Sequence, residues 1–576
     1  MTFRRSIIGA RVAIGVVLTI SALSTANAQG RVAEPYTPAA GATDLKAVLF
    51  NWMRGMGMLR GHDERDMVAS LEYQGKGTIQ VEGQPCTLTK YRASTNYQTF
   101  SQRIQYACTR PNGETYSNIE VVSGLYAWNE DTPGAQIGPT KGTAIPKPET
   151  AQERLVRIWA SPQGAPKAAL AATTETFWLG ANPGTLFADG LAKVGQTSVS
   201  WVAGKPVVTF PIPEVPGATA TATLDAKYMT QRVVVTQGST TTEFVYGDYQ
   251  DWNNPLNKIG VLYAGKMTES RNGAVVRNLT TNVTETGDVY VVAPVPENVR
   301  TAMKVTGQLP RGVMAKTEPS VNKSAPTPRL AGHPDLSGNW AYNDWIGNYM
   351  TGGGRRCAPG QAADCSRDTN QTEDFELYSP SRFGNLGRPI YKPEFWDKVQ
   401  ALDMWTNKED PVMTCQPLGV PREGPPRRIY QTASDVTLLY FGGDAGGGYG
   451  EYRVIPTGGG KHDPKRAIEA TYMGYTIGHW EGDTLVLDSI SFVDTTWLGR
   501  GGLFHSDQMR VVEKFTRQGD ALLYDVTVED PEVLVEPWVL PTRTVRLNPN
   551  PEAGLIRERG DCEVYETKNI SSQIRH

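Results

Sequence analysis

The chain has 576 residues, of which 39% are hydrophobic and 20% are charged, and its formal net charge is -3 at pH 7. This composition allows a sizeable buried core and excludes a disordered chain. The small net charge, without a basic block, argues against binding to nucleic acid or to anionic membrane surfaces. Glycine (59) and proline (39) are frequent, so many turns and short elements are expected.

Residues 1–28 have the pattern of a secretory signal peptide. Arg4, Arg5 and Arg11 precede an apolar run at 12–23, and Ala26 and Ala28 fit the small-residue rule for cleavage. The apolar run is too short for a comfortable membrane span. We therefore expect a mature chain that begins at Gln29, is periplasmic or secreted, and is not stably inserted in a membrane. An uncleaved N-terminal anchor is the alternative.

The six cysteines are expected to form disulfides, because an exported protein meets an oxidising compartment. The simplest pairing joins Cys86 to Cys108, Cys357 to Cys365, and Cys415 to Cys562. A zinc site is the competing interpretation, but the chain has no Cys-x-x-Cys spacing to support it. No metal and no other cofactor is expected.

Residues 29–300 are predicted to form a curved antiparallel sheet with two or three helices packed on it. Apolar residues at helical spacing predict helices at 43–59, 149–160 and 165–172. Asn272-Gly273 predicts a hairpin turn, because both residues tolerate positive φ. Alternating residues predict strands that include 78–81, 119–122, 207–210, 218–224, 231–236, 242–246 and 261–268.

Two runs in this part resemble segments of exported bacterial proteins. One is WASPQGAPKAAL at 159–170, and the other is GDYQDW at 247–252, which is followed by GVLY at 260–263. The pattern of sheet and helices resembles the half-barrel fold of lipoprotein carriers over about residues 45–300. In those carriers the concave face of the sheet holds acyl chains, so the resemblance implies an apolar binding surface and no catalytic residues.

Residues 301–333 are predicted to be a linker, because prolines lie there among Lys, Thr, Ser and Ala without an apolar period. Residues 334–576 are predicted to form an antiparallel β-barrel or sandwich, so that the whole chain is mainly β with some α. Gly-Asn-Trp at 338–340 resembles the opening of lipocalin-like barrels. A helix is expected at 393–405, and strands are expected within 429–441 and 467–528.

The most distinctive motif of the second part is GHWEGDTLVLD at 478–488, which is followed by HSDQM at 505–509. Together with CQPLGVPR at 415–422 it resembles a large group of uncharacterised exported bacterial two-domain proteins, over about residues 335–566. The resemblance implies export and carries no activity. The chain departs from the pattern of this group at 442–450, where a glycine-rich insert stands.

The 478–488 motif predicts a hairpin that turns at Gly482-Asp483. The expected cross-strand pairs are Glu481 with Thr484, Trp480 with Leu485, and His479 with Val486. Asp488 is then diagonal to His479 on a polar face, within reach of its ring. If this face points to solvent, its residues are ordinary surface groups.

If the polar face lines a cavity, Asp488 orients His479 and raises its pKa, which suits general acid–base catalysis. Candidate catalytic residues are therefore His479, Glu481, Asp488, His505 and Asp507, with Asp507 expected to orient His505. Candidate ligand-binding residues are Trp480, Arg422 and Arg427. The arginines suit a ligand carboxylate, with solvated surface ion pairs as the alternative. His462-Asp463-Pro464 is expected to be a turn.

These observations are compatible with two main functions. The favoured one is binding of an apolar or aromatic small molecule, because 13 Trp and 24 Tyr residues occur in a chain with two cavity-forming β parts. The alternative is a periplasmic hydrolase, lyase or hydratase that uses the His/Asp pair of the second part. A third possibility is an envelope interaction protein without a pocket. The oligomeric state is not predicted.

Overall fold

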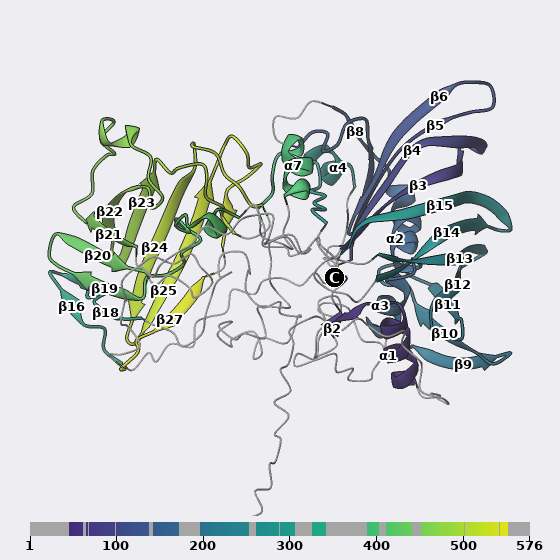
Figure 1. Cartoon of the computed structure of the whole chain (residues 1–576), viewed down its shortest axis with the longest axis horizontal. Helices are drawn as coiled ribbons and strands as arrows, with labels where there is room; N and C mark the ends of the chain where they lie inside the picture. Colours follow the sequence, from purple (N-terminus) through teal and green to yellow (C-terminus); the bar gives the residue numbers. More distant parts are fainter. Residues whose placement is uncertain are drawn as a thin grey trace, which may run out of the picture.

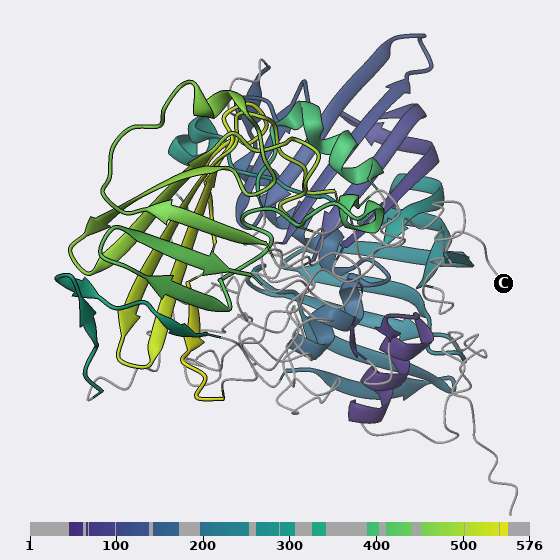
Figure 2. The ribbon, with the colours of Figure 1, turned by 60° about the vertical axis from the view of Figure 1, so that its left-hand side comes forward.

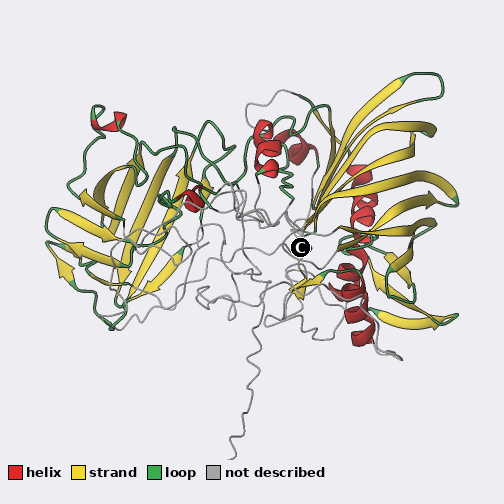
Figure 3. Ribbon diagram, viewed as in Figure 1, coloured by secondary structure: helices red, strands yellow, loops and turns green. Residues whose placement is uncertain are grey.

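The computed structural model describes residues 45–60, 65–66, 68, 70–97, 100–137, 142–171, 196–252, 261–286, 289–303, 305, 325–340, 389–402, 410–440, 451–499, 502–540 and 542–550. The predicted signal peptide, the glycine-rich insert and Cys357, Cys365 and Cys562 lie outside the described residues. The described part is mainly β, with large antiparallel sheets and few helices, as predicted (Figure 3).

The N-terminal part forms one antiparallel sheet of thirteen strands (Figure 1). Strands β3 to β8 form one meander, and strands β9 to β15 form a second. The first meander consists of β3 (Ser70–Val81), β4 (Gln84–Asn96), β5 (Ser101–Thr109), β6 (Thr115–Ser123), β7 (Tyr126–Glu130) and β8 (Ala144–Pro146). The second consists of β9 (Ser198–Val202), β10 (Lys205–Pro211), β11 (Ala218–Leu224), β12 (Thr230–Gln237), β13 (Thr240–Trp252), β14 (Val261–Arg271) and β15 (Ala274–Thr286).

The two meanders join where β3 pairs with β15, with Gly77 opposite Leu279. Gly77 has a φ of 138°, and a Cβ atom at this position would lie 2.0 Å from the carbonyl oxygen of Asn278. Glycine is therefore required for the close approach of the two strands. The predicted turn at Asn272-Gly273 is also confirmed, since both residues have positive φ between β14 and β15.

Three helices lie along one face of this sheet (Figures 1 and 2). They are α1 (Leu45–Gly55), α2 (Ala151–Trp159) and α3 (Gly164–Ala171), close to the three predicted ranges. Their apolar residues recur at helical spacing and are buried against the strands, as Trp52 and Trp159 show with no exposed surface. Each large apolar side chain buried in this way contributes roughly 1.5–3 kcal/mol.

The C-terminal part contains two antiparallel sheets. One consists of β18 (Gly338–Asn339), β19 (Arg428–Gln431), β20 (Asp435–Leu439) and β21 (Tyr452–Pro456). The other consists of β22 (Tyr475–Glu481), β23 (Thr484–Ile490), β24 (Arg510–Gln518), β25 (Ala521–Glu529), β26 (Trp538–Val539) and β27 (Arg543–Arg546). Both sheets contribute to one hydrophobic core, for example through Leu438 and Phe515. Among the described strands the two sheets are not joined into a closed barrel.

The remaining described elements are short. They are β1 (Leu59–Arg60), β2 (Arg65–Asp66), β16 (Arg329–Leu330), β17 (His333–Pro334), α4 (Glu297–Ala302), α7 (Trp396–Ala401) and the 3-10 turns η1 (Pro148–Thr150), η3 (Pro393–Phe395), η4 (Pro411–Thr414) and η5 (Arg466–Ile468). Helix α7 with η3 occupies the predicted helix at 393–405 and ends earlier than expected. Of the helices in the described residues, none is long and apolar enough to cross a membrane.

Residues 389–402 connect the thirteen-stranded sheet to the C-terminal core, and α7 lies between the two parts (Figure 1). The guanidinium of Arg103, from β5, lies 4.2 Å from the ring centre of Trp396. Tyr290 packs in the C-terminal core, and its hydroxyl accepts a hydrogen bond from the backbone N–H of Tyr391 at 2.9 Å. The two parts are thus held together by packed aromatic residues.

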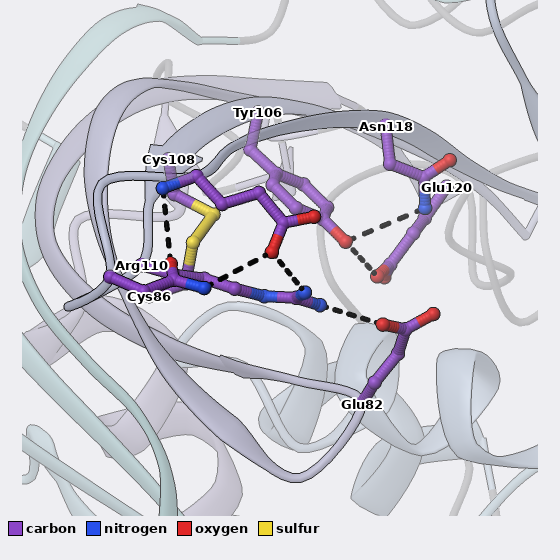
Figure 4. The surroundings of a disulfide bond; sticks show 9 residues. Glu82, Cys86, Tyr106, Cys108, Arg110, Asn118 and Glu120 are labelled. Atoms are coloured by element: carbon purple, nitrogen blue, oxygen red, sulfur yellow. Dashed lines mark hydrogen bonds and ion pairs between the residues drawn. A yellow bond between two sulfur atoms is a disulfide. The ribbon is translucent and has the colours of Figure 1, made fainter.

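The disulfide between Cys86 and Cys108 is present, as predicted, and it staples β4 to β5. Figure 4 shows that polar contacts surround it, including an ion pair between Arg110 and Glu82 at 2.6 Å. Cys415 is also disulfide-bonded, and its partner lies outside the described residues. The predicted pairing of Cys415 therefore remains a prediction.

Candidate functional site

A cavity lies between the middle of the thirteen-stranded sheet and α2. Its volume is about 30 Å³, which has room for one or two water molecules. The lining residues come from the central strands and from α2. They include Leu71, Tyr73, Tyr91, Tyr97, Phe244, Tyr246, Tyr263, Met267 and Leu279, and three charged residues, Arg157, Glu269 and Arg277.

Tyrosine side chains form most of the aromatic wall. The ring of Tyr73 lies 5.2 Å from that of Tyr263 and 6.0 Å from that of Tyr91, measured between centroids. Burial raises the pKa of Tyr73, Tyr246 and Tyr263 well above the usual range, so these phenols are neutral. The wall therefore offers flat apolar surface together with hydroxyl groups, which suits an aromatic or amphipathic molecule.

The charged side of the cavity is organised by Arg157 on α2. Its guanidinium lies 2.7 Å from Glu153, 3.2 Å from Glu269 and 3.4 Å from Glu120. Burial opposes the charge on Arg157, but the three carboxylates prevail and raise its pKa. The arginine therefore ties α2 to both β6 and β14.

Two further arginines complete this ion cluster, which we define as Arg157, Arg271, Arg277, Glu120, Glu153 and Glu269. Arg277 lies 3.1 Å from Glu120 and 3.3 Å from Glu269, and Arg271 lies 2.5 Å from Glu153. Burial opposes ionisation of Glu153, but Arg157 and Arg271 lower its pKa to about 2. Three positive and three negative charges thus balance at neutral pH.

The predicted hairpin of β22 and β23 has the expected register, with Glu481 opposite Thr484 and His479 opposite Val486. The His479 side chain is 44% exposed and lies 3.3 Å from Glu481, whose other oxygen lies 3.3 Å from Lys514. His479 and Glu481 therefore take part in an exposed network of ion pairs on this face.

Asp488 has a different partner from the predicted one. Arg510, on the neighbouring strand β24, donates two hydrogen bonds to Asp488, at 2.8 and 2.9 Å. Burial opposes ionisation of Asp488, but these bonds prevail and lower its pKa. The histidine beside this carboxylate is His462, whose Nε2 lies 3.7 Å from Asp488. His462 was expected only to form a turn, and nothing local in the sequence signals this approach.

His505 and Asp507 are not brought together. His505 is buried, and its ring nitrogens lie 2.7 Å from Thr496 Oγ1 and 2.9 Å from the carbonyl oxygen of Ser506. Asp507 is exposed and accepts a hydrogen bond from Gln508. The carboxylate that organises this turn is Asp530, which accepts two bonds from Ser506, at 2.7 and 2.8 Å.

The candidate ligand-binding residues make separate contacts. Trp480 stacks on His333, with ring centroids 4.4 Å apart. Arg422 is buried and bonded through both terminal nitrogens to Asp410. The backbone of Arg427 continues the pairing with β20 by donating to Leu439. Among the described residues, no group of three or more His, Cys, Asp or Glu side chains is arranged to hold a metal ion.

The ion cluster beside the cavity was not predicted from the sequence. One local signal is Glu153 and Arg157, which are four residues apart on a predicted helix and so share one face. Glu269 and Arg277 face each other across the β14–β15 hairpin, whereas Glu120 comes from β6, which is distant in sequence. Their convergence depends on the curvature and register of the sheet, which the alternation pattern does not give.

The comparisons with known proteins add little to this geometry. No family model matches the chain, and no curated protein matches it. Among solved structures, the crystal structure of a LolA superfamily protein from Nitrosomonas europaea is similar to it, with 7% sequence identity and a TM-score of 0.20. The match covers 43% of this chain and 94% of that chain. A TM-score this low supports no functional conclusion.

Proposed function

We propose that the protein is exported and binds an apolar or aromatic small molecule between α2 and the thirteen-stranded sheet. The observation that carries this proposal is the tyrosine-lined cavity with the ion cluster at its side. Neutral phenols and apolar side chains contact the body of such a ligand, and the charged side orients a polar group on it.

Binding requires the cavity to widen, because pockets for small molecules usually have volumes of about 300–1,000 Å³. The cavity in this structure, at about 30 Å³, corresponds to a closed state. Most of the lining residues are side chains of the sheet strands, and Arg157 is the lining residue from α2. We infer that the lining side chains rearrange when the ligand enters, while the ion cluster keeps α2 on the sheet.

Ligand retention with a matched pair of variants tests this proposal. Leu279, on β15, is buried and lines the cavity, whereas the next residue, Thr280, is exposed on the other face of the same strand. Leu279→Trp fills the cavity and Thr280→Trp does not. The mature proteins are purified from the native cell envelope, and their retained small molecules are identified by mass spectrometry.

We expect wild type and Thr280→Trp to retain the same apolar or aromatic compound, and Leu279→Trp to retain at least about tenfold less of it. Circular dichroism confirms that all three proteins are folded. Equal retention by Leu279→Trp would place the ligand elsewhere in the chain. A wild type that carries and takes up no such compound would refute the binding function.

A further inference from the structure

Hydrogen bonds link several tyrosines of the cavity beside α2 in a series. The guanidinium of Arg277 donates to the hydroxyl of Tyr91 at 3.1 Å. The hydroxyl of Tyr73 is bonded to the hydroxyls of both Tyr91 and Tyr263. The hydroxyl of Tyr263 donates to the Sδ of Met267 at 3.5 Å. All of these residues line the cavity, and we call the series from Arg277 to Met267 the tyrosine relay.

The tyrosine relay holds one hydroxyl proton more than its oxygen atoms can accept. Its three phenols carry three protons, and the two bonds between their oxygens use two of them. Arg277 cannot accept the third proton, because a guanidinium has no acceptor atom. Within the relay the remaining acceptor is the thioether sulfur of Met267, which accepts hydrogen bonds only weakly. A ligand oxygen beside Tyr263 would therefore be a better acceptor than Met267.

The cavity wall at Met267 is partly open to solvent. Met267 and its neighbour Thr268 both line the cavity and are half-buried, whereas Tyr73 and Tyr263 are buried. A methionine side chain is unbranched and flexible, so it can move aside without a shift of the backbone. A ligand that enters at this point reaches the hydroxyl of Tyr263 while the strands stay paired.

The charged residues of the cavity wall do not favour an anionic ligand. Among the described residues that line the cavity, the cations are Arg157 and Arg277. Each of the three side-chain nitrogens of Arg157 lies within 3.4 Å of a carboxylate of the ion cluster. Each of those of Arg277 bonds to a carboxylate of the cluster or to Tyr91. A carboxylate brought into the cavity would lose its hydration without gaining a cation of its own, whereas a neutral carbonyl group carries no such cost.

We propose, on the basis of the binding function proposed above, that the ligand is a neutral aromatic molecule with a carbonyl oxygen, to which the hydroxyl of Tyr263 donates a hydrogen bond. The carbonyl oxygen takes the place of the Met267 sulfur as the acceptor at the end of the tyrosine relay. The aromatic part of the ligand packs against the tyrosine rings of the wall. Tyr263 thus determines the preference for a carbonyl compound over a hydrocarbon of the same shape.

Equilibrium dialysis of the full mature chain with three matched naphthalenes tests the proposal. Methyl naphthyl ketone carries the carbonyl group, isopropenylnaphthalene has a methylene group in place of its oxygen, and naphthoate is an anion of similar shape. In wild type at pH 7 we expect the ketone to bind at least about tenfold more tightly than naphthoate. In Tyr263→Phe we expect binding of the ketone to weaken about fivefold and binding of isopropenylnaphthalene to stay unchanged.

Two further variants are measured with the same compounds. Tyr430→Phe makes the same change at an exposed tyrosine of the C-terminal part and is expected to bind all three compounds like wild type. Leu279→Trp fills the cavity and is expected to abolish binding of both neutral compounds. The isopropenyl compound also shows whether Tyr263→Phe keeps an intact cavity, because this compound cannot accept the hydrogen bond.

The outcomes separate this inference from the binding function on which it rests. If Leu279→Trp blocks both neutral compounds but Tyr263→Phe weakens them equally or not at all, the role of Tyr263 is overturned and the binding function stands. Naphthoate that binds at least as tightly as the ketone overturns the neutral class of ligand in the same way. If wild type binds none of the compounds, or if Leu279→Trp blocks none of them, the binding function in this cavity fails and the inference fails with it.

Discussion

Burial decides the protonation of His505. Desolvation lowers its pKa, and the bond to the Ser506 carbonyl and the charge of Asp530 offset this only in part. The folded protein therefore holds a neutral imidazole where the unfolded chain has an ordinary histidine with a pKa near 6.5. Below that pH the unfolded chain binds the proton more tightly than the folded protein, so the free energy of unfolding falls as the pH falls.

We predict that His505 makes the protein less stable between pH 6.5 and 5 and has no such effect above pH 6.5. Urea unfolding of wild type at pH 7 and pH 5 measures the loss. In His505→Gln, the change from pH 7 to pH 5 is expected to lower the free energy of unfolding by less than in wild type, because the titrating group is gone. His479→Gln, at an exposed position, serves as the control and should behave like wild type. Equal losses in His505→Gln and wild type would contradict the prediction.

Local residue patterns predicted the β22–β23 hairpin correctly but not the contacts of its side chains. Gly482 accepts the positive φ of the turn, and alternation assigns each neighbour to a face, so the register follows from the sequence. Asp488 meets Arg510 because β24 pairs beside β23, and it approaches His462 because a distant loop packs there. Neither contact follows from the hairpin itself.

At the scale of elements, α2 is held to the sheet both by apolar side chains on one face and by charged side chains on the other. Its apolar face buries Leu155, Ile158 and Trp159 in the core. Its polar face places Arg154 against the backbone carbonyls of Val121 and Trp128, at 2.7 and 2.6 Å, and Arg157 in the ion cluster. Removing one member of a buried ion cluster leaves charges that are neither hydrated nor paired, which costs more than the loss of the contact itself.

We predict that Arg157→Leu lowers the free energy of unfolding by about 3–5 kcal/mol, because Glu120, Glu153 and Glu269 lose a shared partner. Arg300→Leu removes an exposed arginine that pairs with Glu297 on α4, and it is expected to cost at most about 1 kcal/mol. Chemical unfolding of both variants and wild type gives the comparison. A loss in Arg157→Leu no larger than in Arg300→Leu would show that the cluster does not hold α2.

The helices and many strands were predictable because their signals are local. Strand β11 coincides with the predicted range 218–224, and α1, α2 and α3 differ from their predicted ranges only at the ends. The single sheet of thirteen strands was not predicted as such, since its order depends on which strand pairs with β3. The ion cluster was missed for the same reason, because Glu120 on β6 reaches Arg277 on β15 only through that order.

At the scale of the whole molecule, Trp396 joins the two parts of the chain. Its ring lies under the guanidinium of Arg103, and its indole N–H donates to Tyr391 at 2.8 Å. Asp397, the next residue, is exposed and pairs with Arg92 at 3.1 Å. The aromatic contact is buried and the ion pair is not, so the aromatic contact carries most of the coupling.

We predict that Trp396→Ala separates the thermal unfolding of the C-terminal part from that of the thirteen-stranded sheet. Differential scanning calorimetry should show two transitions that lie further apart than in wild type. Asp397→Asn removes only the exposed ion pair and is expected to leave the profile almost unchanged. Unchanged transitions in Trp396→Ala would mean that other contacts couple the two parts.

The pairing of β3 with β15 also governs the order in which the sheet is completed. All other neighbours in the sheet are joined within one meander, by connections much shorter than the segment between β3 and β15, so their closure costs less entropy. β3 is made early and β15 late, so β3 presents a row of unpaired N–H and C=O groups until the second meander arrives. The residues of α2 and α3 are synthesised between the two meanders. We therefore expect the two half-sheets to come together on these helices, and the seam that crosses Gly77 to close last.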